Sequence, residues 1–408
     1  MSDKNTKKIL IFSLVYYPNY IGGAEVAIKE ITDRISSEDY EFHMITLRFD
    51  SNLPHEERIG NIFIHRVGFS KNGATVNNLG KFPLFLNKYL MPLFGFLKAN
   101  SLHKKYSFDG IWNMMASYSA FAGLFFKLRH PEVKYLLTLQ EGDPINYIRS
   151  RVKYVYPLFG KIFTKADFVQ TISTHLAKWA RSEGYIGPLL VIPNGVDTKY
   201  FSRANPERNL DKVRQKLGKQ KNDIYLVTTS RLVRKNACDD VIKALALLPQ
   251  NVHFAIIGIG PDEKDLRRLA KENKLEARVH FWGEIKHDQM PSYLKVCDIF
   301  IRPSLSEGFG ISFIEAMAAD LPVIATQEGG IADFIFDPER NPNKLSTGRA
   351  VNPRDPEGIA RAVELYISDK KKTEEIIKNA REMVFQKYDW NLIARDMKEK
   401  VFDTLFRI

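Results

Sequence analysis

The chain is too long for one ordinary domain, because it has 408 residues, of which 44% are hydrophobic and 26% are charged. Its two cysteines, Cys238 and Cys297, are too few for a disulfide framework. Cys297 lies in an apolar run that predicts a buried free thiol, so a reducing cytoplasm is the expected location. The start of the chain lacks the pattern of a signal peptide, and no run of about eighteen apolar residues predicts a membrane span.

The net charge of +12 is concentrated in one part of the chain. Residues 60–165 contain 15 Lys and Arg but only 4 Asp and Glu, a balance of +11, whereas the rest of the chain balances at +1. A regional charge of this kind predicts an anionic partner for that region. Nucleic acid would account for the charge, but no nucleic-acid recognition motif accompanies it, so no nucleic-acid partner is expected.

Short apolar runs alternate with longer helical patterns along the first half of the chain. Apolar strands separated by helices are typical of a parallel sheet that is covered on both faces. The predicted strands are Ile9–Val15, Phe42–Leu47, Ile62–Val67, Gly110–Met114, Tyr135–Leu139, Phe168–Ser173 and Leu190–Ile192. The predicted helices include Ala24–Ser36, Tyr118–Leu128, Arg149–Phe163 and Thr174–Ser182.

Turn residues interrupt the alternation at Pro193-Asn194-Gly195-Val196-Asp197, and a polar stretch follows from about Ser202 to Asn222. The alternation then restarts, which predicts a second α/β domain. A natural ligand site is then the cleft between two facing domains, since ligands bind at the carboxyl ends of parallel strands. The later predicted strands are Ile224–Thr229, His253–Ile257, Val279–Trp282, Ile299–Arg302 and Val323–Ala325.

The most informative stretch runs from Pro303 to Gly330 and reads PSLSEGFGISFIEAMAADLPVIATQEGG. Glu307 and Glu315 lie eight positions apart in it, around the glycine turn Gly308-Phe309-Gly310. A strand that ends in a glycine turn and opens a helix presents backbone N–H groups and a positive helix terminus to phosphate. Two carboxylates beside such a turn can hold hydroxyls, so the stretch predicts a sugar-nucleotide site; helix-dipole stabilisation by Glu315 is the structural alternative.

Two further turns follow predicted strands of the second half. Arg231 and Lys235 lie in the loop SRLVRKN after Ile224–Thr229, where cations can neutralise a diphosphate leaving group; a solvated basic loop is the alternative. Gly258 and Gly260 form an incomplete G-x-G turn, a weak motif that fits a turn beside a nucleotide base or ribose.

Two segments of the first half are weaker candidates for the same chemistry. Gly22-Gly23-Ala24-Glu25 follows the first strand, and its glycines would let a ligand approach the backbone, although a turn with a helix cap explains them equally. Gln140, Glu141 and Asp143 follow a strand and are candidate acceptor-side residues, with ordinary loop polarity as the alternative. The nine histidines lack metal-ligand spacing and there is no D-x-D pair, so no metal site is expected.

Two basic and aromatic segments suggest contact with an anionic membrane surface. Residues 81–98 read KFPLFLNKYLMPLFGFLK, and residues 144–165 have five basic residues, no acidic residue and several aromatic rings. Pro83, Pro92 and Gly95 make residues 81–98 a poor continuous helix, and a buried core segment is the alternative for them. The hypothesis is peripheral association with the inner face of a membrane.

These motifs resemble the landmarks of the retaining family 4 (group 1) glycosyltransferases of GT-B fold. The pattern E-x7-E from Glu307 to Glu315, with SRLVRKN, IPNGVD, the early GGAE and the closing GG, recurs in that family's usual order over nearly the whole chain. The resemblance implies two Rossmann-like domains facing across a cleft, residues 1–195 on the acceptor side and residues 196–388 for the nucleotide sugar. The helical tail, residues 389–408, would return to the first domain.

The resemblance also implies roles for particular residues. Glu307 would hold hydroxyls of the donor sugar, Glu315 would bind the ribose, and Arg231 and Lys235 would stabilise the departing diphosphate. The amides of Phe309, Gly310 and Ile311 would face the sugar or phosphates, with Gly22 and Gly23 near the phosphates and the acceptor. Two departures from the family pattern stand out: Gln140 occupies a position where many relatives carry histidine, and Ala332-Asp333 replaces the usual proline-glutamate after the last GG.

The function expected from the sequence is a retaining, metal-independent glycosyltransferase of hexosyl type without a cofactor. Its partners would be a nucleotide-sugar donor and a lipid-linked or envelope glycan acceptor. Two alternatives stay open: a sugar-nucleotide epimerase of the same fold, and a non-catalytic, membrane-associated sugar-nucleotide-binding protein. Product analysis separates the first alternative, because an epimerase needs no acceptor. Intact Arg231, Lys235, Glu307 and Glu315 count against the second.

Overall fold

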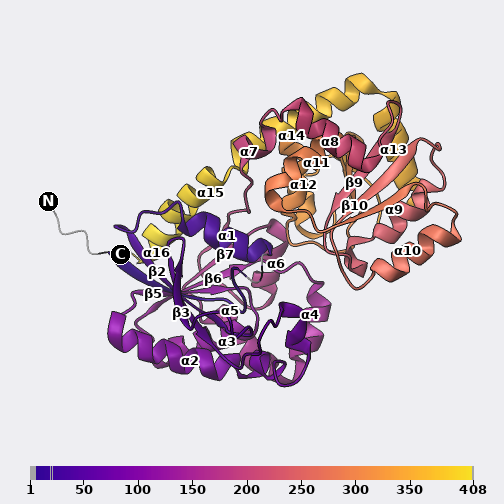
Figure 1. Cartoon of the computed structure of the whole chain (residues 1–408). Coiled ribbons are helices and arrows are strands. Elements are labelled where there is room, and N and C mark those ends of the chain that lie inside the picture. Colours follow the sequence, from indigo (N-terminus) through magenta and orange to yellow (C-terminus); the bar gives the residue numbers. More distant parts are fainter. Residues whose placement is uncertain (1–5, 19, 21, 407–408) are drawn as a thin grey trace. The chain divides into compact units, whose positions relative to one another are not determined.

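The computed structural model describes residues 6–18, 20 and 22–406, and the chain divides into two compact units (Figure 1). The first unit runs to Asn194 and resumes at Trp390, and the second is Gly195–Asp389. Each unit is built around a largely parallel sheet that is covered by helices. The α/β class predicted for both halves is therefore confirmed.

The first unit contains an eight-stranded sheet in the order β3-β4-β2-β1-β5-β6-β7-β8. Its central strand β1 is completely apolar where it crosses the core: Ile9, Leu10, Ile11 and Phe12 all have 0% exposure. Adjacent strands run parallel except β3 and β4, which form an antiparallel edge pair that the sequence did not predict. The strands are β1 (Lys7–Phe12), β2 (Tyr40–Leu47), β3 (Glu56–Ile59), β4 (Ile62–Val67), β5 (Gly110–Met114), β6 (Lys134–Leu139), β7 (Phe168–Thr171) and β8 (Leu189–Val191).

Helices cover both faces of this sheet (Figure 1). Successive residues of β5 show the two faces: the ring of Trp112 lies 5.2 Å from that of Phe402, while Asn113 packs under Gly123 of α3. The chain after Trp390 therefore forms part of the first unit's core. The helices are α1 (Gly23–Thr32), α2 (Leu86–Tyr106), α3 (Tyr118–Arg129), α4 (Ile145–Val152), α5 (Tyr156–Thr164), α6 (Thr174–Ser182), α15 (Trp390–Asp396) and α16 (Asp403–Phe406), with a π-helical turn at Met397–Phe402 and 3-10 turns at Val76–Gly80 and Lys153–Val155.

The expectation that Pro92 and Gly95 make residues 81–98 a poor helix is wrong, because α2 runs unbroken from Leu86 to Tyr106, and only residues 81–85 lie outside it. Pro92 removes only one backbone donor, and the lost hydrogen bond is offset by packing against α3. Gly95 makes that packing close: a Cβ atom there would lie 2.7 Å from the Cβ of Ala122. Among the described helices, none is long and apolar enough to cross a membrane.

The predicted helix Arg149–Phe163 is divided in the structure. The 3-10 turn at Lys153–Val155 separates α4 from α5, and Pro157 occupies the first turn of α5, where a missing N–H costs little. Only α5 buries an apolar face, formed by Phe159, Ile162 and Phe163, whereas α4 has no fully buried residue.

The second unit contains a six-stranded parallel sheet in the order β11-β10-β9-β12-β13-β14. Its core joins the strands to α9 and α13 through residues such as Leu226, Val241, Ile256 and Val363, all at most 1% exposed. The strands are β9 (Ile224–Thr229), β10 (Val252–Ile257), β11 (Val279–Gly283), β12 (Ile299–Arg302), β13 (Val323–Ala325) and β14 (Arg349–Ala350). Cys297 is buried and free, as its apolar run predicted, and Cys238 is buried and free as well.

The polar stretch from Ser202 to Asn222 is not merely a connection, because it contains α8. Only Val213 and Leu217 of this helix are buried, so the sequence shows little apolar periodicity. The helices are α7 (Thr198–Ser202), α8 (Glu207–Leu217), α9 (Cys238–Leu245), α10 (Glu263–Glu272), α11 (Met290–Val296), α12 (Ile311–Ala318), α13 (Pro356–Ser368) and α14 (Lys370–Lys387), with 3-10 turns η3 (Arg234–Asn236), η4 (His287–Gln289) and η5 (Gly329–Asp333).

Candidate active site

The loop between β12 and α12 is held by a buried arginine. Arg302, the last residue of β12, donates from Nη2 to Oε2 of Glu307 at 2.9 Å and from Nη1 to Oγ of Ser312 at 2.8 Å. The side chains of Arg302 and Glu307 are only 6% and 16% exposed. A charge-assisted pair in a partly buried setting restricts the carboxylate more than a surface pair would. Arg302 therefore fixes both Glu307 and the first turn of α12.

Gly310 makes the start of α12 possible, as the glycine turn in the sequence suggested. Its φ of 90° lies in the left-handed region, and a Cβ atom would lie 2.8 Å from Nη2 of Arg302. The helix begins at Ile311, so Glu315 lies in its second turn as predicted. The side chain of Phe309 is buried against Phe334, with 5.1 Å between ring centroids, which leaves the backbone of this residue as its candidate contribution to a ligand.

The turn after β13 packs directly on the Glu307 loop. The N–H of Gly330 donates to the carbonyl oxygen of Glu307 at 2.9 Å. Gly329 has φ 64°, and a Cβ atom there would lie 2.1 Å from the same carbonyl oxygen. The closing GG of the motif thus allows the backbone of this turn to pack closely on the Glu307 loop.

The basic loop after β9 is joined to the Glu307 loop by the backbone. The N–H of Leu305 donates to the carbonyl oxygen of Lys235 at 2.7 Å, and β9 and β12 are neighbours in the sheet. Asn236 donates from Nδ2 to the carbonyl oxygen of Arg231 at 2.6 Å, which holds the loop in a tight turn. Arg231 is exposed and Lys235 is partly exposed at this edge.

Gly258 and Gly260 allow two loops to pack closely against each other. A Cβ atom on Gly258 would lie 2.0 Å from the carbonyl oxygen of Ser230, and one on Gly260 would lie 2.2 Å from that of Leu232. The N–H of Leu232 also donates to the carbonyl oxygen of Ile259 at 3.0 Å. The glycines therefore pack the turn after β10 against the basic loop, and their contact with a nucleotide stays a prediction.

Glu315 has a partner that the sequence did not single out. Nε2 of His287, in η4, lies 3.3 Å from Oε1 of Glu315, whose side chain is 14% exposed. The imidazole of His287 stacks on the ring of Tyr200 with an interplanar angle of 8°. His287 stands in a polar 3-10 turn without a motif of its own, so no sequence pattern connected it with Glu315.

In the first unit, Gly22 and Gly23 lie at the start of α1. The N–H of Gly22 donates to Oε2 of Glu25 at 3.0 Å, and a Cβ atom on Gly22 would meet the same oxygen at 2.7 Å. Burial raises the pKa of Glu25 to about 7. The glutamate of the GGAE motif thus supports the glycine turn from within the fold.

The three candidate acceptor residues after β6 have different environments. Oε1 of Gln140 accepts a hydrogen bond from Nδ2 of Asn194 at 3.0 Å, and Asp143 is exposed. Glu141 is only 6% exposed and accepts a hydrogen bond from the N–H of Ala116 at 2.6 Å. Burial raises the pKa of Glu141 to about 7. Glu141 thus holds the loop that follows β5, and contact of these residues with an acceptor stays a prediction.

The candidate residues fall into two groups. The second unit brings together the loops of Arg231, Lys235, Gly258, Gly260 and Glu307, with α12 beside them. The first unit holds Gly22, Gly23, Gln140, Glu141 and Asp143 at the carboxyl ends of β1 and β6. Within residues 6–18, 20 and 22–406, one group could hold a metal ion, formed by His103, His130 and Glu132, and it includes none of the candidate site residues.

Comparisons with known proteins match both halves of the chain. Residues 21–200 match the family model described as Glycosyltransferase Family 4, and residues 209–383 match Glycosyl transferases group 1. An uncharacterised glycosyltransferase of Methanocaldococcus jannaschii is 24% identical over 95% of this chain and 96% of its own length. The GDP-mannose-dependent α-(1-6)-phosphatidylinositol monomannoside mannosyltransferase of Mycobacterium tuberculosis is 30% identical over 57% of this chain and 61% of its own.

Solved structures share the fold over the full length. The sucrose-phosphate synthase of Thermosynechococcus elongatus superposes with a TM-score of 0.79 at 22% identity, covering 97% of this chain and 98% of its own. Anabaena HepE in complex with UDP-glucose superposes with a TM-score of 0.73 at 20% identity, covering 97% and 99%. These likenesses confirm the GT-B fold that the motifs implied.

Proposed function

Because this chain belongs to the group 1 glycosyltransferases, we propose that it transfers a hexosyl group from a nucleotide-sugar donor to an acceptor hydroxyl, with retention at the anomeric carbon. The observation that carries the proposal is the 2.7 Å hydrogen bond between Leu305 and Lys235, which joins the basic loop to the Glu307 loop. One ligand can then present its diphosphate to the cations and its sugar hydroxyls to the carboxylate.

The chemistry follows from the charges of these loops. The bond between the anomeric carbon and the phosphate oxygen breaks, and Arg231 and Lys235 stabilise the negative charge that develops on the diphosphate. The acceptor oxygen attacks the anomeric carbon from the same face, and its proton passes to the departing phosphate. Glu307 accepts hydrogen bonds from the sugar, and Glu315 from the ribose. The proposal assigns no step to a metal ion or cofactor, because the two cations supply the charge stabilisation.

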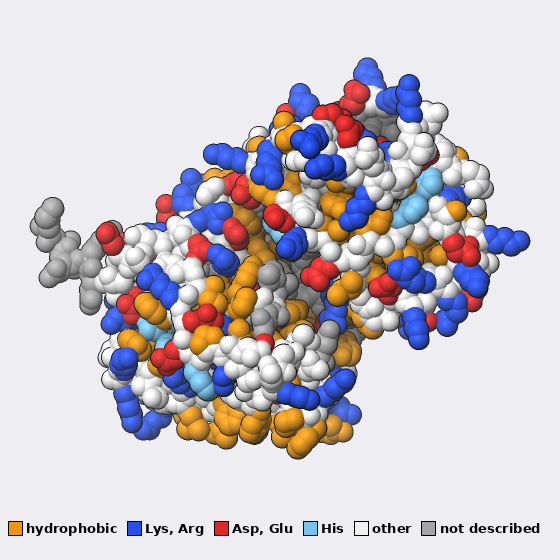
Figure 2. Space-filling view, in the orientation of Figure 1, with side chains coloured by type: hydrophobic (Ala, Val, Ile, Leu, Met, Phe, Trp, Pro, Cys, Tyr) orange, Lys and Arg blue, Asp and Glu red, His pale blue; other side chains and the backbone are white. Residues whose placement is uncertain are grey.

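We further propose a lipid-linked acceptor at an anionic membrane surface. On α2, the side chains of Tyr89, Leu93 and Leu97 recur at helical spacing and are 50–59% exposed. Figure 2 shows hydrophobic side chains gathered on the edge of the first unit where α2 lies. Leu97 also lines an apolar hollow of about 310 Å³ with Phe69 and Phe94. An exposed apolar stripe in a basic region suits the headgroup layer, and the mycobacterial relative is named for a phosphatidylinositol substrate.

The donor roles are tested by removing one cation at a time. Arg231→Ala and Lys235→Ala should each lower kcat/KM for sugar transfer by about 100-fold or more, as loss of a transition-state donor does. Arg234→Ala is the matched control, because Arg234 is an exposed cation of the same loop with no assigned role. The donor is first chosen by the rise in melting temperature with UDP-, GDP- and ADP-sugars.

Two outcomes would contradict the proposal. Unchanged transfer in both variants would remove the cations from the mechanism. A product formed from the donor without any acceptor would indicate an epimerase instead. The anomeric configuration of the transferred sugar, measured by NMR, tests retention directly.

The membrane proposal is tested on α2. Leu93→Ser with Lys88→Glu should reduce sedimentation with anionic liposomes, whereas Leu247→Ser, at a 54% exposed leucine of the second unit, should leave it unchanged. Lys98 is left unchanged because its Nζ lies 2.8 Å from Oε1 of Glu56, so its replacement would also remove an ion pair. Liposome binding equal to that of the wild type would overturn the membrane proposal while leaving the donor proposal untouched.

A further inference from the structure

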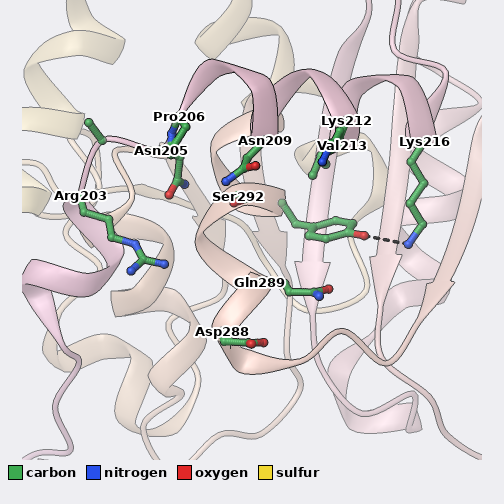
Figure 3. Close-up of a pocket in the computed structure, with 12 residues that line it drawn as sticks. Arg203, Asn205, Pro206, Asn209, Lys212, Val213, Lys216, Asp288, Gln289 and Ser292 are labelled. Carbon is green, nitrogen blue, oxygen red and sulfur yellow. Dashed lines mark hydrogen bonds between the residues drawn. The ribbon is translucent and has the colours of Figure 1, made fainter.

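A second concave site lies in the second unit, apart from the candidate active-site loops. It encloses about 610 Å³ between the connection that leads into α8, the helix α8 itself, and the start of α11 (Figure 3). This volume is in the range of sites that bind small organic ligands. None of the residues proposed to contact the donor lines it.

The lining is suited to an anion. Arg203, Lys212 and Lys216 contribute three positive charges, against one carboxylate, Asp288. Figure 3 shows Arg203 and Lys216 at opposite ends of the pocket, with Asn209 between them. Lys216 is oriented by a 2.8 Å hydrogen bond from its Nζ to Oη of Tyr293. Cations spread around one hollow favour a ligand with charged phosphate oxygens over a neutral one.

Asn205 places an unsatisfied polar group beside the pocket. It lines the same pocket, and its Nδ2 atom is buried without a hydrogen-bond partner in the described structure. A buried donor without an acceptor is destabilising, and such groups usually have a partner. The amide of Asn205 would have to turn toward the hollow before an oxygen of a ligand could accept a hydrogen bond from it.

The pocket is connected to Glu315 by stacked side chains. The guanidinium of Arg203 lies 4.1 Å from the ring centroid of Tyr200, and the ring of Tyr200 stacks on that of His287. His287 reaches Glu315, while Asp288 and Gln289 of the same turn, η4, line the pocket. The hydroxyl of Tyr200 also donates to the carbonyl oxygen of Asp288 at 2.6 Å. A ligand that binds the guanidinium of Arg203 would therefore change the position of Tyr200 and of His287, which contacts Glu315.

We propose that this pocket binds a small phosphorylated molecule of about sugar-phosphate size, and that its occupation changes donor affinity through Arg203, Tyr200 and His287. The coupling rests on the proposed function, because it requires the donor ribose at Glu315. The binding does not, since the pocket is separate from the donor residues. By linkage, the donor must change the affinity of the pocket ligand by the same factor.

Binding is tested by calorimetry with glucose 6-phosphate as the probe, and glucose at equal ionic strength as the comparison. The wild type should bind glucose 6-phosphate and not glucose. Lys212→Ala combined with Asn209→Ala should weaken binding at least tenfold, because both side chains are exposed and can be removed without breaking the core. Lys271→Ala, at an exposed lysine of α10, is the control and should bind as the wild type does.

Arg231→Ala distinguishes the two sites. If this variant loses the probe while the Lys212 and Asn209 variant keeps it, the phosphate occupies the candidate active site and the proposal is wrong. Absence of binding to the wild type also overturns it. Either result leaves sugar transfer, and hence the proposed function, unaffected.

Coupling is tested by titrating the donor with and without saturating probe. The donor Kd of the wild type should change at least threefold, and Arg203→Gln, which removes the charge stacked on Tyr200, should reduce the change to near onefold. An unchanged donor Kd in the wild type would overturn the coupling. A coupling that persists in Arg203→Gln would show that it does not pass through the stack.

Discussion

The carboxyl edges of the two sheets use their glutamates differently. In the second unit, Glu307 is presented by a buried arginine at the end of its own strand, and its carboxylate is 16% exposed. In the first unit, Glu25 and Glu141 are buried and hold backbone N–H groups of neighbouring loops. Glu307 is thus held in place but partly exposed, whereas Glu25 and Glu141 are more deeply buried and support loops of the first edge.

This difference explains what the sequence motif of each edge specifies. Gly258, Gly260 and Gly329 of the second edge each allow a close approach to another loop, so this requirement appears as a pattern in the sequence. On the first edge the motif specifies the support of the loops, and the residues that meet an acceptor can vary with that acceptor. Contact of Gln140 with an acceptor therefore stays a prediction.

The largest expected effect comes from Arg302→Met, which tests whether the presentation of Glu307 depends on its partner. Removing one member of a buried pair costs about 3–5 kcal/mol, and the donor should bind at least tenfold more weakly because Glu307 is no longer held. Arg381→Met is the control, since Arg381 and Asp320 form a surface pair with side chains 44% and 41% exposed, worth under about 1 kcal/mol. Unfolding by urea and donor calorimetry measure the two effects. Equal donor affinity in Arg302→Met and the wild type would show that Glu307 needs no such support.

The pH dependence of Glu141 tests the opposite role on the first edge. Because burial raises its pKa from 4.5 to about 7, the folded state favours the protonated carboxyl. The stabilisation is present below pH 4.5 and is lost as the pH rises through 7, by up to about 3 kcal/mol at 1.36 kcal/mol per pKa unit. Glu141→Gln keeps an oxygen for the N–H of Ala116 and cannot ionise, so its stability relative to the wild type should rise between pH 5 and pH 8. The free energy of unfolding in urea at the two pH values measures this, with Glu38→Gln, at an exposed glutamate of the first unit, as the control.

If the relative stability of Glu141→Gln does not change with pH, Glu141 is ionised in the folded protein at both values. It would then be free to act as a charged group toward an acceptor, and the contrast between the two edges would be lost.

Gly329→Ala tests how closely the closing GG packs on the Glu307 loop. The added Cβ would lie 2.1 Å from the carbonyl oxygen of Glu307 at φ 64°, so both strain and overlap contribute, about 2 kcal/mol or more in all. Gly218→Ala is matched in the same unit, with φ 67° and nothing within 4 Å of the added atom, and should cost about 1 kcal/mol from strain alone. Equal losses in urea unfolding of the two variants would mean that the GG turn can move away without cost.

The sequence predicted those parts of the fold in which local pattern and burial agree. Seven strands of the first sheet were placed because their residues are continuously apolar, but β3 was missed because EERI is largely exposed at a sheet edge. β14 has two residues, Arg349 and Ala350, too few for any pattern. The helix α2 was misjudged because the tolerance of Pro92 and Gly95 depends on packing with α3, which no local rule contains.

Among the site residues too, the sequence predicted those with a local pattern and missed those whose contacts form only on folding. Glu307, Glu315 and the glycines were found because their types and spacing are characteristic. Arg302 looked like the end of an apolar strand, and only the folded loop shows that it pairs with Glu307. His287 lies 28 positions before Glu315, and their contact is produced by the folding of the second unit.

The smallest expected effect concerns His287. Two variants of this residue distinguish a direct contribution to donor binding from an indirect one through the stacked rings that connect Glu315 with the pocket beside α8. The 3.3 Å contact of His287 with Glu315 is long, and the imidazole is 69% exposed, so it should contribute under about 1 kcal/mol to donor binding. His287→Phe keeps a ring to stack on Tyr200 and loses the contact with Glu315, whereas His287→Ala loses both. The donor Kd, measured by calorimetry, should change by less than about fivefold in either variant. A much larger loss in His287→Phe would place the imidazole among the groups that hold the donor. A loss confined to His287→Ala would instead show that the stacked rings hold η4 in position, so that the donor edge depends on the wall of the second pocket.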